Sequence, residues 1–170
     1  ALGRDLATAG LTVVSGLARG IDTAAHLGAL DARGRTVAVL GSGLDRLYPP
    51  ENAALARAIA GEGAVVSEFP LGTSPWKGNF PRRNRVIAGW ARATVVVEAG
   101  ARSGALSTAR AALDEGREVM AVPGHPFDAR ASGCNMLIRD GAVLVRGVQD
   151  VLEALGTPGE ARPDCPWAQV

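Results

Sequence analysis

The chain has 170 residues, of which 47% are hydrophobic and 21% are charged, an ordinary balance for one globular domain with a sizeable core. Its net charge of +1 excludes a chain-wide basic field, so a nucleic-acid site would have to be a local patch. Two cysteines without paired spacing argue against a disulfide scaffold and a zinc site, and no apolar run is long enough to cross a membrane. We therefore expect a cytoplasmic protein with no membrane segment, no metal and no cofactor.

Short apolar runs alternate with amphipathic stretches along most of the chain. After a first helix at 2–9, the runs are rich in valine and nearly continuous, which is typical of strands buried on both faces of a parallel sheet. The predicted strands are 11–14, 36–40, 64–66, 94–97, 118–122 and 142–145. This alternation predicts an α/β fold of three layers, with helices on both faces of a doubly wound, mostly parallel sheet.

The stretches between the strands carry apolar residues at helical spacing. Three such faces are predicted, formed by Leu55, Ala58 and Ile59, by Val86, Ile87 and Trp90, and by Leu106, Ala109 and Leu113. A last helix at 148–155 has one apolar stripe, which would either cover the sheet or form part of a dimer contact. We assign residues 1–156 to one domain and residues 157–170, where the pattern is lost, to a linker or disordered tail.

Three predicted strands end in turns rich in glycine, at 15–22, 40–52 and 98–109. In a doubly wound sheet the ligand crevice lies beyond the carboxyl ends of the strands. Glycine lets the backbone approach a ligand closely, and successive amides before a helix N-terminus form a cradle for anions. One such turn is equally consistent with a purely structural role. Three at one edge predict an anion-binding crevice.

A nicotinamide-dinucleotide site is one alternative for this crevice. Gly41 and Gly43 match the first two glycines of the dinucleotide fingerprint, and Glu68 could imitate its ribose-binding acid. The third glycine position is Arg46, where close packing of helix on strand requires a small residue. The broken fingerprint disfavours this alternative.

Residues typical of catalysis have simpler interpretations in this chain. Asp22 and His26 are four residues apart and could serve acid–base chemistry, but we favour a local hydrogen-bonded pair at a helix start. Asp22 and Asp45 are interpreted as caps or braces of turns, Cys134 as a small buried residue, and His125 as a loop residue. No catalytic residue is assigned.

The segment WKGNFPRRNR, at 76–85, combines cations with aromatic rings. Cations neutralise phosphates and aromatic faces stack unpaired bases, which together are the two requirements of single-strand recognition. Basic residues at the start of a helix oppose its dipole unless an anion is bound. The alternative is a solvated helix start with Trp76 and Phe80 packed in the core.

These motifs, in this order, resemble the DNA-processing protein A (DprA/Smf) family. The matching strings are SGLARGIDTAAH, VAVLGSGLDRLYPPEN, SEFPLGT, NFPRRNRVIAG, VVVEAGARSGALSTA, GREVMAVPG and GCNMLIRDGA, which cover about residues 10–155. The resemblance implies a Rossmann-like domain that binds single-stranded DNA without sequence specificity. It also implies that the protein forms a homodimer, loads the RecA recombinase onto DNA in natural transformation and has no catalytic activity.

The resemblance also implies which residues contact DNA. Lys77 and Phe80 match the family's Lys-x-x-Phe-Pro segment, and the adjoining residues are weaker candidates. The full set of implied DNA-binding residues is Lys77, Phe80, Arg82, Arg83, Asn84 and Arg85, with Ser15, Gly16, Gly41, Gly43, Ser103 and Gly104 in the glycine turns.

The chain departs from the family pattern at both ends and offers one enzymatic alternative. The family's first strand, which ends in a Gly-Ser-Arg turn with a key DNA-binding arginine, would precede Ala1, and its winged-helix domain would follow the tail. Related Rossmann-like enzymes, the nucleoside-monophosphate phosphoribohydrolases, carry paired glutamates after a similar glycine loop. Ser107 and Thr108 stand at those positions here, so hydrolysis lacks its stabilising carboxylate, although nucleotide binding stays open.

Overall fold

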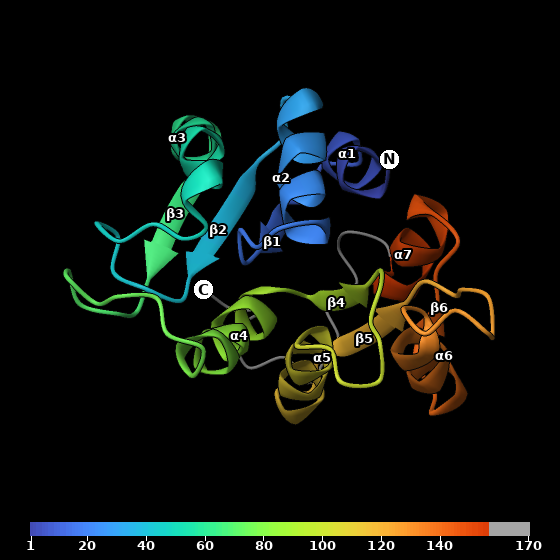
Figure 1. The fold of residues 1–170 in the computed structure, drawn as a ribbon. Coiled ribbons are helices and arrows are strands. Elements are labelled where there is room, and N and C mark those ends of the chain that lie inside the picture. Colours follow the sequence, from blue (N-terminus) through green and yellow to red (C-terminus); the bar gives the residue numbers. More distant parts are fainter. Residues whose placement is uncertain (157–170) are drawn as a thin grey trace.

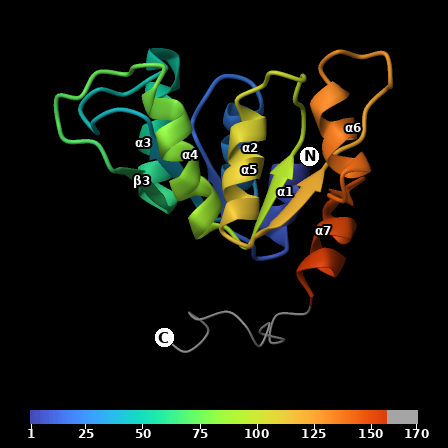
Figure 2. The same ribbon diagram turned by 90° about the horizontal axis from the view of Figure 1, so that it is seen from below.

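A computed structural model describes residues 1–156, in which six parallel strands form two sheets of three (Figures 1 and 2). Each sheet follows the order of the sequence, β1-β2-β3 and β4-β5-β6. The strands are β1 (Val13–Ser15), β2 (Thr36–Leu40), β3 (Ala64–Ser67), β4 (Ala93–Val96), β5 (Glu118–Ala121) and β6 (Val143–Leu144). The predicted tail at 157–170 lies outside the described residues.

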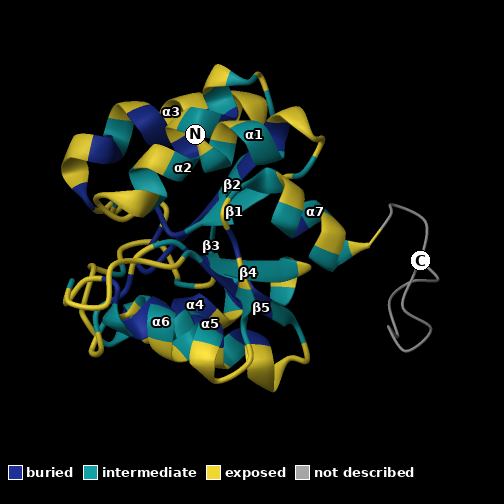
Figure 3. Cartoon of the chain, turned by 90° about the vertical axis from the view of Figure 1, so that its right-hand side faces the viewer, coloured by how far each residue is buried: buried dark blue, intermediate teal, exposed yellow. Residues whose placement is uncertain are grey.

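Helices cover both faces of the sheets, which confirms the predicted three layers (Figure 3). The helices α1, α2 and α3 lie on one face and α4, α5 and α6 on the other. Their bounds are α1 (Leu2–Thr8), α2 (Ile21–Asp31), α3 (Ala53–Glu62), α4 (Asn79–Trp90), α5 (Ala105–Asp114), α6 (Ser132–Arg139) and α7 (Val148–Leu155), with a short 3-10 helix, η1 (Pro50–Asn52). No helix in residues 1–156 has the length and hydropathy needed to cross a membrane.

The core is built largely from small side chains, so helices and strands approach closely. Ala38, Ala56, Ala109, Ala112 and Ala121 are all buried. One core cluster lies under α3 in the first sheet and another joins α4, α5 and α6 to the second sheet. In a core packed this closely, a larger side chain costs folding free energy because it must displace its neighbours.

The last helix, α7, covers the second sheet. Val151 is buried, and Val151 and Leu155 pack in a cluster with Met120, Leu2 and Leu6. The sequence left two roles open for the apolar stripe of α7, covering the sheet or forming a dimer contact. Val151 and Leu155 take the first role and cover the sheet.

Three predicted features differ in detail from the structure. The first strand begins two residues later than predicted, because the backbone from Leu6 to Leu11 is still closing α1 through the Leu11 N–H to Leu6 carbonyl bond. Ala58 is exposed, and Ala56 takes the predicted place beside Ile59. Trp90 and Leu113, predicted on apolar faces, are each 59% exposed and lie in the last turns of α4 and α5.

The sheet is interrupted between β1 and β4, whose facing edges make no hydrogen bonds with each other within the described residues. A slot of about 770 Å³ separates them. Its walls are β1 and β4, with α1, α2, α4, α5 and α7 closing it. The slot is therefore the boundary at which the two three-stranded sheets face each other.

Candidate nucleic-acid interface

The three glycine-rich turns follow β1, β2 and β4 and therefore lie at the carboxyl edge of the parallel strands (Figure 2). The segment 76–85, which includes the first half of α4, touches all three turns. It bonds to the first turn through Arg83, packs on the second through Phe80 and reaches the start of α5 through Asn84. Segment 76–85 and the three turns therefore share one edge of the sheets.

Arg83 is a buried tether and not an exposed cation. Only 5% of the residue is exposed, and its Nη1 donates to the carbonyls of Gly16, at 2.9 Å, and Val39. Its Nε donates to Asn84 Oδ1 at 3.1 Å, and burial lowers the pKa of the guanidinium. A methyl group at Gly16 would lie 2.5 Å from Arg83 Nη2, so the glycine makes room for the tether. Nη1 and Nε of Arg83 are thus committed to the framework, and its role as a phosphate contact stays a prediction.

Asn84 also serves the framework. It is 8% exposed, and its Nδ2 donates to Ser107 Oγ at 2.9 Å. The Ser107 hydroxyl in turn donates to the Gly104 carbonyl at 2.7 Å. This chain of bonds fixes the third glycine turn against α4. Asn84 therefore positions the third turn, and its expected contact with DNA stays a prediction.

Phe80 forms an aromatic pair with Tyr48 from the turn after β2. Their ring centroids are 5.9 Å apart with the planes at 46°, and Tyr48 is 39% exposed. A methyl group at Gly41 would lie 2.8 Å from the Phe80 ring, so this glycine lets the ring sit on the backbone. The guanidinium of Arg19, which also bonds to Glu51, lies 5.6 Å from the Tyr48 centroid. Tyr48 was missed from sequence, although it is the only tyrosine in the chain and stands in a turn at the predicted crevice.

The exposed cations of the segment fall into two kinds. Arg85 is paired with Glu68 at 2.5 Å, which leaves it less available to a phosphate. Lys77 and Arg82 are exposed and form no ion pair within residues 1–156, and the Arg82 guanidinium lies 5.8 Å from the centroid of Phe69. Trp76, 62% exposed, lies against Gly78 beside Lys77 and is not in the core.

The backbone amides of the three turns differ in whether a ligand could use them. In the first turn, the Gly16 and Ala18 amides each donate to the Asp22 carboxylate at 3.1 Å. In the second, the Gly43 amide donates to the Thr73 carbonyl at 2.9 Å. The Asp22 carboxylate thus takes two amides of the first turn, and the Thr73 carbonyl takes one of the second.

The third turn keeps its donors free. Within the described part of the chain, the amides of Gly100, Ala101, Arg102 and Gly104 make no hydrogen bond. They precede α5, whose N-terminus favours an anion, and the Arg102 side chain beside them is exposed. Ser103 turns inward to brace the loop, its Oγ accepting from the Ala105 amide at 3.3 Å. The third turn therefore remains a candidate anion-binding site.

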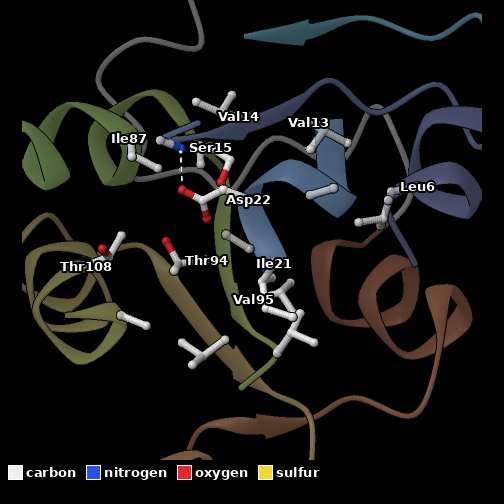
Figure 4. Close-up of a pocket in the computed structure, with 18 of the residues that line it drawn as sticks. Leu6, Val13, Val14, Ser15, Ile21, Asp22, Ile87, Thr94, Val95 and Thr108 are labelled. Carbon is white, nitrogen blue, oxygen red and sulfur yellow. Dashed lines mark hydrogen bonds between the residues drawn. The ribbon is translucent and has the colours of Figure 1, made fainter. Parts of the chain in front are cut away.

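The slot between the sheets opens at this edge. Of the residues predicted from sequence, its lining includes Ser15, Gly16, Phe80, Arg83, Asn84 and Gly104. Lys77, Arg82, Arg85, Gly41, Gly43 and Ser103 do not line it. Deeper in, the walls are apolar, with Leu6, Val13, Ile21 and Val95 pointing into the space (Figure 4). Asp22 lies near the mouth, with its carboxylate bonded to the backbone after β1.

The residues that suggested acid–base chemistry are accounted for by the framework. His26 does not bond to Asp22, and the predicted pair is wrong: its Nδ1 lies 2.7 Å from Thr36 Oγ1, whose proton goes to the Val13 carbonyl. Nδ1 therefore carries the ring proton, and burial lowers the pKa of His26 to about 4. Asp45 braces the second turn by accepting from the Gly72 amide at 2.7 Å, as predicted. Cys134 is fully buried, also as predicted.

Comparisons with known proteins agree with this architecture. The model of the family described as DNA recombination-mediator protein A matches residues 1–156. The chain is 49% identical over 162 residues to protein Smf of Escherichia coli, covering 95% of this chain and 43% of that protein. Matches of this kind to Smf of Synechocystis and DprA of Streptococcus pneumoniae cover 38% and 50% of those proteins, so the chain spans about half of these relatives or less.

Two solved structures share the fold. The X-ray structure of DprA from Streptococcus pneumoniae matches with a TM-score of 0.82 and 45% identity, over 91% of this chain and 56% of that one. The DprA structure from Helicobacter pylori, which concerns its single-stranded DNA binding mode, matches with a TM-score of 0.80 and 28% identity, over 91% and 70%. With a family model matching nearly all of its described residues, the chain belongs to the DNA recombination-mediator protein A family.

Proposed function

We propose that this chain binds single-stranded DNA, without sequence preference, along the carboxyl edge of its strands. The observation that carries the proposal is the pairing of free amides with aromatic rings at the mouth of one slot. Gly104 of the third turn and Phe80 of α4 line the same cavity, with Tyr48 against Phe80. The amides and the helix N-terminus suit a phosphate, and the rings suit an unpaired base.

Lys77, Arg82 and Arg102 supply the charge that such binding needs. All three are exposed and none forms an ion pair within residues 1–156. Neutralising phosphates releases counterions, and each contact on a single strand changes the slope of log K against log salt by about 0.7. The binding should therefore weaken steeply with salt although the net charge of the chain is only +1.

Oligothymidylate binding, followed by fluorescence anisotropy over a salt series, tests the proposal. Lys77→Ala should flatten the salt slope by about 0.7. Phe80→Ala should weaken binding by about 1–3 kcal/mol, the range for one lost base stack. Arg35→Ala is the control, since this exposed arginine precedes β2 at the opposite edge of the sheet. If Lys77→Ala and Phe80→Ala bind like the parent, the site is wrong.

The family resemblance extends the proposal to the full-length protein. We propose that it acts in the cytoplasm as a homodimer and loads the RecA recombinase onto the bound strand in natural transformation. Co-sedimentation with RecA and single-stranded DNA tests this step, and RecA filament formation that is unchanged by the protein would contradict it. We also propose that the chain is not an enzyme, because Ser107, which stands at a catalytic-acid position, is used to hold the third turn.

A further inference from the structure

The loop between β5 and α6, residues 122–131, presents an aromatic ring to solvent. Phe127 is 93% exposed, more than any other large hydrophobic residue described in the structure. Burial of such a ring would stabilise the fold, so its exposure forgoes that free energy. An isolated exposed phenylalanine on a loop at a ligand edge is therefore a candidate contact for a partner molecule.

The loop is braced on both sides of the ring. Asn135 of α6 clamps Gly124, accepting from its amide at 3.1 Å and donating to its carbonyl at 3.0 Å. Asp128 accepts from the Arg130 amide at 2.9 Å and pairs with its guanidinium at 3.0 Å. The His125 and Phe127 rings are 5.7 Å apart with their planes at 50°. Because the backbone on each side is held, the ring is presented on a built support and loses little freedom on binding.

This loop adjoins the turn that has free amides. The Gly133 amide, at the start of α6, donates to the Ala99 carbonyl at 2.8 Å. A methyl group at Gly100 would lie 3.2 Å from the Ala129 carbonyl, which shows how closely the two segments approach. Figure 2 shows the loop, drawn in orange above α6, at the same edge as the turn after β4. The α4 segment that carries Phe80 and the loop that carries Phe127 thus both adjoin the turn after β4.

We propose that Phe127 is a second stacking platform for an unpaired base, with His125 beside it, so that one strand runs from Phe80 across the 100–104 amides to Phe127. This inference rests on the proposed single-strand binding and adds a contact on the second sheet. The turn that adjoins both segments offers a sugar–phosphate backbone the free amides of Gly100, Ala101, Arg102 and Gly104 and the exposed Arg102 side chain, with the exposed carboxylate of Glu98 at its start. A single ring flanked by polar and charged groups suits a base face better than the broad apolar patch of a protein interface.

Strand length separates this contact from the first one. Anisotropy is measured with oligothymidylates of about 6 and about 20 nucleotides, which bracket the usual site sizes for single strands. Phe127→Ala should weaken binding of the long strand by between about 5-fold and about 150-fold, which corresponds to one lost stack, and change the short strand much less. Phe80→Ala should weaken both lengths. Leu113→Ala is the matched control, because Leu113 is 59% exposed at the other end of α5.

The possible results separate the two proposals. If Phe80→Ala weakens binding and Phe127→Ala binds the long strand like the parent, the second platform is refuted and the proposed function stands. If the parent binds neither length, both proposals fail. Thermal unfolding serves as the structural check, since the exposed Phe127 ring should leave the midpoint of Phe127→Ala at the parent value.

Photo-crosslinking gives a readout that does not depend on affinity. A long strand carrying 5-iodouracil at every position should crosslink to peptides containing Phe80 and to peptides containing Phe127. Crosslinks at Phe80 alone would contradict the path across the second sheet.

Discussion

Arg83→Met separates a structural tether from a DNA contact. In the parent, Arg83 donates to two buried backbone carbonyls, those of Gly16 and Val39. An acceptor left without a partner costs about 1–3 kcal/mol, which gives about 2–6 kcal/mol for the pair. Because methionine removes a guanidinium that had to be desolvated, we expect the lower part of that range, about 2–4 kcal/mol.

The assays are thermal unfolding and the salt dependence of oligothymidylate binding. At about 2–4 °C per kcal/mol for a domain of this size, Arg83→Met should lower the midpoint by about 4–16 °C. Arg83 is 5% exposed and already bonded, so the salt slope of the folded variant should equal that of the parent. Arg82→Met is the matched control on the same helix. Its exposed side chain predicts a stability change within about 0.5 kcal/mol and a salt slope reduced by about 0.7.

One pair of results would refute this reasoning. If Arg83→Met melts like the parent and loses salt dependence as Arg82→Met does, then Arg83 reaches phosphate and does not hold α4 to the first sheet.

Three further predictions follow from the framework. Burial lowers the pKa of His26 from 6.5 to about 4. Between these values the unfolded chain binds more protons than the folded chain. The free energy of unfolding should therefore fall by about 3 kcal/mol as the pH drops from above 6.5 to below 4. Urea unfolding across that range checks this: His26→Gln should remove the dependence, whereas replacement of the exposed His125 should keep it. Gly16→Ala should cost about 1–3 kcal/mol, because its methyl group meets the Arg83 guanidinium, and an unchanged urea midpoint would contradict the tight approach. Incubation with nucleoside monophosphates should release no free base, as chromatography would show, and clear release would overturn the non-enzymatic assignment.

The sequence by itself determined the layers and the edge where the site lies. Valine-rich runs at regular intervals predict buried parallel strands, and this pattern is read locally, so the six strands and the first and last helices were predicted within two residues. The exceptions have local causes. Trp90 and Leu113 continue the apolar spacing into the last turns of α4 and α5, where each is 59% exposed.

The sequence predicted which residue types gather at the candidate site, but it did not predict the role of each residue there. Segment 76–85 contains Arg82, Arg83 and Arg85 within four positions. From their spacing alone, the three arginines are equally good candidates for contacting phosphate. Within residues 1–156, Arg82 is exposed and forms no ion pair, Arg83 is buried and Arg85 is paired with Glu68. The Phe127 loop carries no motif, so its exposed ring emerged only from the fold.

Tertiary structure decided which groups remain available to a ligand. Arg83 donates to the Gly16 carbonyl, 67 positions away in sequence. Two amides of the first turn, those of Gly16 and Ala18, donate to the Asp22 carboxylate. Availability of a donor depends on every neighbour that packs around it, and those neighbours come from distant segments. The residue types at the carboxyl edge follow from the sequence, whereas the free amides at 100–104 and the unpaired Lys77 and Arg82 follow from how the two sheets and α4 pack together.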